Sequence, residues 1–176
     1  MLDSATAYSR YKFLGYEFLT WLWFVIETQP TLAAKFIDGY VELRVGNKIV
    51  FENMRNQTRE TITIKGDDPP AEAGKLSLKN GAYIAALNLI LKTESNTWQF
   101  TINGDLMNIG GLKSTGGGAM ADSSDEVEAA VLDRIYAIGA VMEFIDHLFS
   151  DYLALRSRSE WELSIIPSMR AWFGGV

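Results

Sequence analysis

The chain has 176 residues, of which 48% are hydrophobic and 22% are charged, and it contains no cysteine. This composition excludes a disordered chain, which lacks the apolar surface that offsets chain entropy. The absence of cysteine excludes disulfides, thiolate nucleophiles and thiolate metal sites. The formal net charge of −6 argues against a general nucleic-acid coat, because such a coat needs clustered positive charge. The length fits one domain, which we expect to span residues 1–176.

The first predicted element is a helix over residues 4–27, where apolar residues recur at steps of three and four. From residue 18 onwards both faces are apolar, and a helix of that kind has to be covered on more than one side. The apolar run at 13–26 is shorter than the ~20 residues that a membrane span needs, and it contains Glu17. We therefore expect a cytoplasmic protein with no membrane partner.

Aromatic side chains crowd this first helix, and they allow three interpretations. They pack in the core, they contact a second copy or another protein partner, or they stack on nucleic-acid bases, which requires adjacent positive charge. Because the helix is apolar on both faces, we predict that part of it is shared between chains. The predicted interface residues of this segment are Tyr11, Phe18, Trp21, Trp23 and Phe24.

Short runs of alternating apolar and polar residues predict strands within 36–66, at 83–92 and at 98–102. Gly46-Asn47 separates two β-prone runs and predicts a hairpin turn. The segment 75–80 is ambiguous between helix and strand. Short strands joined by turns favour an antiparallel sheet, and we expect about five strands.

The segment 110–124 is rich in glycine and has few side chains that could pack. We predict a flexible loop there. Its glycine spacing does not match a phosphate-binding loop, which needs G-x-x-x-x-G-K followed by Ser or Thr.

Two helices are predicted at the C-terminal end, over residues 125–156 and after Ser159, where Ser159 and Glu162 have the spacing of a capping box. Pro167 is expected to kink or restart the second one. The first would be about 48 Å long at 1.5 Å per residue, so we expect part of it to reach a partner. Arg134 falls within its apolar stripe. That position fits either a side chain that pairs with an acid or an interface arginine, and we include Arg134 among the predicted interface residues.

The search for catalytic chemistry finds one weak candidate. Glu143, His147 and Asp151 are spaced four residues apart on one face of the long helix, and such a row could hold a divalent metal ion. The row lies opposite the apolar stripe, however, which favours a solvated face. No serine-hydrolase, dinucleotide-binding or zinc-protease motif occurs. We expect no cofactor and no enzymatic activity.

The segment Tyr11-Lys12-Phe13-Leu14-Gly15-Tyr16-Glu17-Phe18-Leu19-Thr20-Trp21-Leu22-Trp23 resembles a segment of bacterial proteins linked to the recombination-associated RdgC family. The resemblance implies an oligomeric, non-catalytic factor of DNA recombination. It carries no functional residue to this chain, and it leaves direct DNA binding open.

Taken together, these patterns predict an α+β fold with an N-terminal helix, an antiparallel sheet of about five strands and two C-terminal helices, one of them long. The expected function is that of a non-catalytic assembly or interaction protein that forms a homodimer. The alternative is an accessory factor in bacterial or phage DNA recombination.

Overall fold

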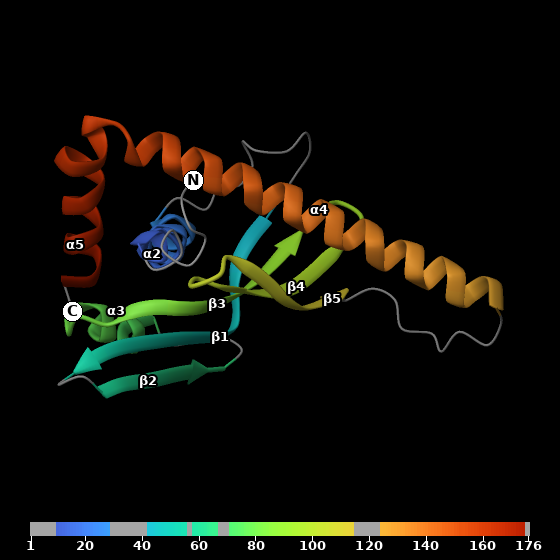
Figure 1. Ribbon diagram of the computed structural model, residues 1–176, viewed down its shortest axis with the longest axis horizontal. Coiled ribbons are helices and arrows are strands. Elements are labelled where there is room, and N and C mark those ends of the chain that lie inside the picture. Colours follow the sequence, from blue (N-terminus) through green and yellow to red (C-terminus); the bar gives the residue numbers. More distant parts are fainter. Residues whose placement is uncertain (1–9, 29–41, 56–57, 67–70, 115–123, 175–176) are drawn as a thin grey trace.

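The fold is α+β, as predicted, and is built on a five-stranded antiparallel sheet with the strand order β2-β1-β3-β4-β5 (Figure 1). The computed structural model describes residues 10–28, 42–55, 58–66, 71–114 and 124–174. The elements are, in chain order, α2 (Phe13–Thr28), β1 (Glu42–Arg55), β2 (Thr58–Lys65), α3 (Ala71–Lys79), β3 (Tyr83–Lys92), β4 (Thr97–Asn103), β5 (Asn108–Ser114), α4 (Ser124–Arg156), the π-helical turn η2 (Trp161–Ile165) and α5 (Ile166–Gly174).

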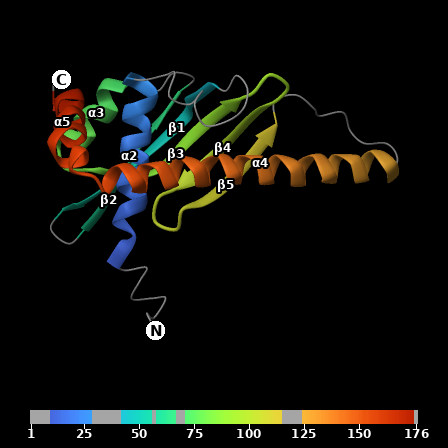
Figure 2. The same cartoon turned by 90° about the horizontal axis from the view of Figure 1, so that it is seen from above.

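Helices α2 and α4 cover the same face of the sheet and cross each other steeply (Figure 1 and Figure 2). Helices α3 and α5 lie at one end of this layer. With 33 residues, α4 is longer than the sheet is wide, and its first part extends beyond β5 into solvent. The opposite face of the sheet carries no described helix.

Helix α2 is the centre of the core, which explains why it is apolar on every side. The ring of Phe18 packs edge-on against Phe149 of α4, with 5.1 Å between centroids. The indole of Trp23 contacts Phe51 of β1 and Trp172 of α5, at centroid distances of 5.9 and 4.9 Å. The sheet, α4 and α5 therefore each cover one side of the same helix.

The start of α2 is in close contact with the turn after β4. A Cβ atom on Gly15 would lie 1.9 Å from the carbonyl oxygen of Gly104, a distance that no side chain tolerates. Glycine at position 15 is therefore required for α2 to lie this close to the sheet.

The predicted hairpin at Gly46-Asn47 is wrong, because β1 runs without interruption from Glu42 to Arg55. The two residues lie in an irregularity of β1, where its register against β3 shifts between Val45 and Ile49. Asn88 of β3 stabilises this bulge, since its side-chain oxygen accepts a hydrogen bond of 3.1 Å from the backbone N–H of Asn47. The residues that connect β1 to β2, 56–57, lie outside the described part of the chain.

Two further segments differ from the predictions. Residues 110–114 belong to β5 rather than to a flexible loop, because backbone pairing with β4 does not need side chains. The rest of the predicted loop, 115–123, lies outside the described residues. The ambiguous segment 75–80 forms most of the short helix α3.

The last helical segment begins differently from the prediction as well. Glu160, not Ser159, is the N-cap of the π-helical turn, and it makes no side-chain capping hydrogen bond. Pro167 lies in the first turn of α5, where its missing N–H costs little, and α5 follows the π-helical turn with no non-helical residue between them.

Candidate functional site

Four of the predicted interface residues are buried inside the single subunit. Phe18, Trp21, Trp23 and Phe24 are between 0 and 6% exposed. The prediction that they form an interface is corrected here, because the sheet, α4 and α5 already cover them. Of the predicted interface residues in the N-terminal segment, Tyr11, which is 46% exposed, remains at the surface.

Glu17, the one acid within the apolar part of α2, is bound by α4. Its Oε1 atom accepts hydrogen bonds from the hydroxyl of Tyr152, at 2.6 Å, and from Nε of Arg156. Burial raises the pKa of the Tyr152 hydroxyl, and the hydrogen bond to Glu17 raises it further. This cluster joins α2 to α4, and its carboxylate is already satisfied, so it is a poor general base.

A second satisfied carboxylate lies on β1. Glu52 of β1 accepts a hydrogen bond of 2.7 Å from Nε of Arg59 and one of 3.2 Å from the hydroxyl of Tyr83. Burial and then the contact with Glu52 raise the pKa of Tyr83. The three groups tie β1 to its two neighbouring strands.

The predicted metal-binding row does not form a site. Glu143, His147 and Asp151 are all exposed on α4. Within the described residues, no group of three His, Cys, Asp or Glu side chains is arranged to hold a metal ion.

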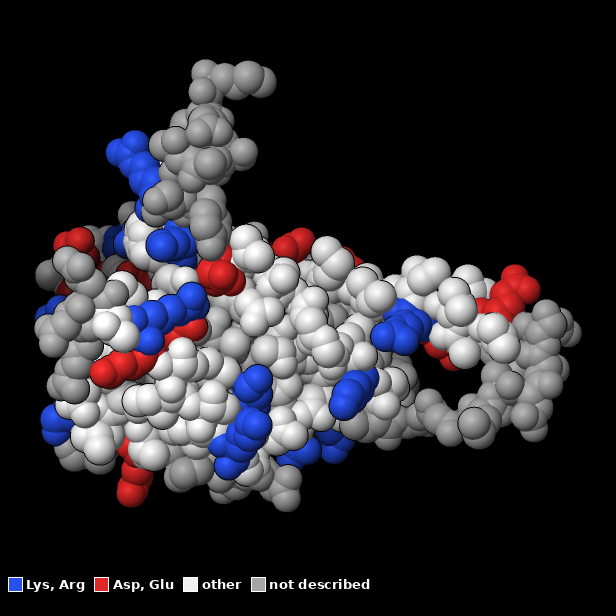
Figure 3. Space-filling view, turned by 60° about the horizontal axis from the view of Figure 1, so that its bottom comes forward, with Lys and Arg blue, Asp and Glu red and all other residues white. Residues whose placement is uncertain are grey.

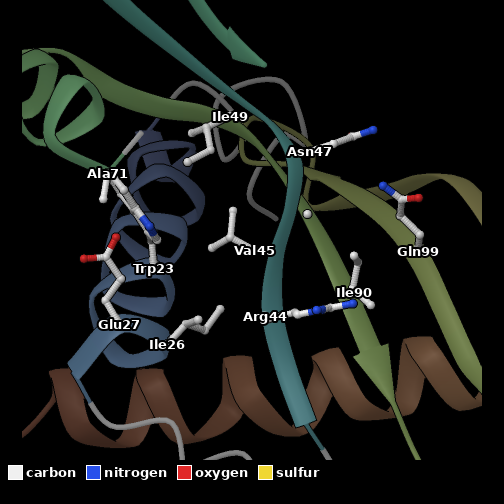
Figure 4. Close-up of a pocket in the computed structure, with 11 residues that line it drawn as sticks. Trp23, Ile26, Glu27, Arg44, Val45, Asn47, Ile49, Ala71, Ile90 and Gln99 are labelled. Carbon is white, nitrogen blue, oxygen red and sulfur yellow. The ribbon is translucent and has the colours of Figure 1, made fainter. Parts of the chain in front are cut away.

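A hollow of about 690 Å³ lies beside the end of α2 (Figure 4). Its two charged lining residues are on opposite sides of β1: Glu27 faces the helices and Arg44 faces the outer side of the sheet. Glu27 is bound by Lys75, at 2.7 Å, and by the indole N–H of Trp172, at 3.0 Å. The hollow therefore brings no acid–base pair together.

The most unusual surface of the molecule is the outer half of α4, residues 124–142, whose first turns extend beyond the edge of the sheet (Figure 1 and Figure 2). Every side chain from Val127 to Tyr136 is exposed, including that of Arg134. Of the fifteen exposed large apolar side chains in the described part of the chain, seven lie here. They are Val127 (51% exposed), Val131 (53%), Leu132 (59%), Ile135 (60%), Tyr136 (66%), Ile138 (43%) and Met142 (52%).

Five of these seven side chains form one stripe along α4, at an angular step of about 100° per residue. Leu132 and Tyr136 lie on a second face of the same helix. We use "the stripe" below for the first set alone, which consists of Val127, Val131, Ile135, Ile138 and Met142.

A second surface feature is the basic outer face of the sheet. The strand registers place Arg44, Ile90, Gln99 and Lys113 in one row across four strands. Most of their neighbours along the strands are buried or half-buried, so this row faces outwards. Figure 3 views the molecule from this side, with basic side chains spread among uncharged ones.

Lysines extend this basic face. Lys48 and Lys65 are register partners on β1 and β2 and lie next to buried or half-buried isoleucines, so both also point outwards. Arg44, Lys48, Lys65 and Lys113 make no ion pair with any described residue. The alternation of these cations with apolar residues was a signal for this face, but only the strand pairing shows that they lie together.

Comparisons with known proteins find no protein-family model and no curated protein that matches this chain. In the parts of the chain that the structure describes, none of the helices combines the length and the apolar character of a membrane span.

Proposed function

We propose that this protein is a non-catalytic assembly protein of the cytoplasm that forms a homodimer through the outer half of α4. The observation that supports the proposal is the exposure of seven large apolar side chains on the outer half of α4. Monomeric proteins rarely expose a contiguous apolar surface of this kind, and such surfaces mark sites of protein contact.

The stripe has enough apolar surface to support association. Full burial of a Val, Ile or Met side chain is worth about 1.5–3 kcal/mol, and the five stripe side chains are 43–60% exposed. Two copies that cover each other's stripes gain roughly 7–15 kcal/mol. This gain is of the same size as the roughly 4–15 kcal/mol that association costs in lost translational and rotational freedom, so the apolar area is sufficient for a dimer but does not set its affinity.

Helix stability also supports a shared outer half. Isolated helices shorter than ~12–15 residues are marginal in water, because helices in proteins owe most of their stability to packing. The first buried side chain in the described part of α4 is Ala137. The described side chains before it, from Val127 to Tyr136, are all exposed, and a second copy would supply contacts for them.

Light scattering across a micromolar concentration series tests the proposal. We expect a mass of twice 19.6 kDa for the natural chain and a monomer for Ile135→Glu, which places a charge in the centre of the stripe. Leu106→Glu is the matched control, because Leu106 is an exposed leucine (63%) in the turn between β4 and β5. A natural chain that stays at 19.6 kDa throughout, or an Ile135→Glu variant that dimerises like the control, contradicts the proposal.

The basic outer face favours one second candidate, an accessory factor in DNA recombination that contacts DNA directly. Arg44, Lys48, Lys65 and Lys113 form no ion pair with a described acid, and cations of this type supply the phosphate contacts that dominate nucleic-acid affinity. The face offers few aromatic rings, so we expect contact with the DNA phosphate backbone rather than stacking on the bases.

Binding of single- and double-stranded DNA across a salt series tests this second candidate. We expect binding at low salt that weakens as salt rises and that is lost in the variant Arg44→Gln, Lys48→Gln, Lys113→Gln. Arg170→Gln, an exposed cation on α5, is the control. Equal binding by the triple variant and the control, or no binding at low salt, excludes DNA contact through this face.

A further inference from the structure

The stripe on α4 has the spacing that two packed helices require. Val131, Ile135, Ile138 and Met142 follow one another at steps of four, three and four residues, which keeps all four side chains on one face of the helix. Gly139 lies beside this seam, and a Cβ atom there would have no atom within 4 Å, so the backbone is open to close approach by another helix.

We propose that two copies of the chain pair through the stripe as antiparallel helices, with a two-fold axis near Ile135. This inference rests on the proposed homodimer and adds the orientation and the contacts of its interface. The stripe runs from Val127 to Met142, so its midpoint lies between Arg134 and Ile135. Two antiparallel stripes cover each other completely when these midpoints coincide.

The charges along the outer half favour the antiparallel orientation. The sequence of the first turns of α4, Ser124-Asp125-Glu126-Val127-Glu128, is acidic. In a parallel pair the acidic turns of both copies would lie side by side at the interaxial distance of about 8–10 Å. In the antiparallel pair they are about 24 Å apart at 1.5 Å per residue, which is several times the Debye length of about 8 Å at physiological ionic strength.

The antiparallel pair also places most of each acidic turn against uncharged sequence. The span Ile135–Met142 of the partner contains no charged residue, and Glu143 is the first acid beyond it. Glu128, the described acid of these turns, then lies at the level of uncharged residues of the other copy instead of at the level of a second Glu128.

The second apolar face, with Leu132 and Tyr136, is the competing seam on the same helix. Its two large side chains are one turn apart and have no large apolar neighbour further along α4, because Ala129, Ala140 and Glu143 come next on that side. The stripe has five large apolar side chains instead of two, so it can pack along its whole length against the same stripe of a second copy.

The absence of cysteine from the chain makes disulfide cross-linking a clean test. Single variants Val127→Cys, Ile135→Cys and Met142→Cys are purified, checked for unchanged folding by circular dichroism, and oxidised mildly. A disulfide needs Cβ atoms about 3.5–4.5 Å apart, so only positions that meet across the axis are linked.

The antiparallel pair predicts a specific pattern. Ile135→Cys forms covalent dimers efficiently, with at least about tenfold more product than the control Leu106→Cys, because pairing raises the effective thiol concentration. Val127→Cys and Met142→Cys do not link to themselves. When these two variants are mixed, they link to each other.

Other patterns overturn the inference in distinguishable ways. If Val127→Cys and Met142→Cys each link to themselves and the mixture adds nothing, the helices are parallel. If Leu132→Cys and Tyr136→Cys link instead, the seam is the second face. If no disulfide forms in a protein that light scattering shows to be a dimer, the interface lies elsewhere. If the mass is that of a monomer, the proposed homodimer is wrong.

Discussion

Helix α2 and the outer half of α4 are both apolar on more than one side, but the first is buried within the subunit and the second is exposed. The rings of α2 are covered by the sheet, α4 and α5, so that Phe18 is 0% and Trp23 is 2% exposed. The outer half of α4 extends beyond β5 and leaves Ile135 60% exposed. An apolar sequence on several faces therefore predicts that a helix packs against other elements. The position of the helix relative to the sheet determines whether those elements belong to the same subunit.

The largest expected effect comes from the buried helix. Trp23→Ala is predicted to lower the free energy of unfolding by about 3–5 kcal/mol, because it leaves a cavity next to Phe51 and Trp172. Urea denaturation measures this loss. If Trp23→Ala instead leaves stability unchanged and abolishes association, α2 is the shared helix and the comparison is reversed.

A smaller loss is expected where α2 joins α4. Glu17→Ala removes the acceptor of the Tyr152 hydroxyl, which is fully buried, and is predicted to cost about 1–3 kcal/mol of unfolding free energy. Glu162→Ala, an exposed acid of the π-helical turn, is the control and should change stability by less than about 0.5 kcal/mol. Equal stability of the two variants in urea denaturation would show that the Glu17 cluster does not hold the helices together.

The same cluster predicts how stability depends on alkaline pH. Burial raises the pKa of Tyr152 in the folded state above the value of about 10 found in unfolded chains. The folded state therefore binds this proton more tightly, so its contribution is complete below pH ~10 and decreases as the pH rises further, by up to about 1.4 kcal/mol per pH unit.

Tyr152→Phe is expected to reduce that alkaline slope, and the comparison of urea denaturation at pH 9 and about pH 11 measures it. The natural chain should lose more stability over this interval than the variant does. Identical slopes would mean that another group titrates in place of Tyr152.

The smallest effect on stability is expected in the outer half of α4. Ile135→Glu should change the unfolding free energy of the monomer by less than about 0.5 kcal/mol, because the side chain is exposed there. The measurement is denaturation at a concentration below the dimer range. A large loss in the monomer would indicate that the outer half packs on its own subunit.

Local patterns predicted several elements well, for physical reasons that particular residues show. Trp98, Phe100 and Ile102 alternate in β4, and all three are buried against the helices. The long helix was predicted within one residue at its start, because a 33-residue helix repeats its apolar spacing many times. Both patterns are contained in neighbouring residues.

The wrong predictions concern features that depend on residues far apart in the sequence. The Gly46-Asn47 pair looks like a hairpin turn until Asn88, 41 residues later, is seen to bond the Asn47 N–H within a continuous strand. Local sequence also does not reveal the basic outer face, because Arg44 and Lys113 are brought into one row only by the pairing of four strands. The interface prediction for α2 failed since periodicity does not reveal which element covers a helix.

Hydrogen–deuterium exchange at two protein concentrations tests most directly whether the outer half of α4 is shared while α2 is not. We predict that amides in residues 127–142 exchange more slowly at the higher concentration, where dimers form, and that amides of α2 are equally protected at both. Fast exchange of residues 127–142 at every concentration, or protection of α2 that depends on concentration, would contradict this account.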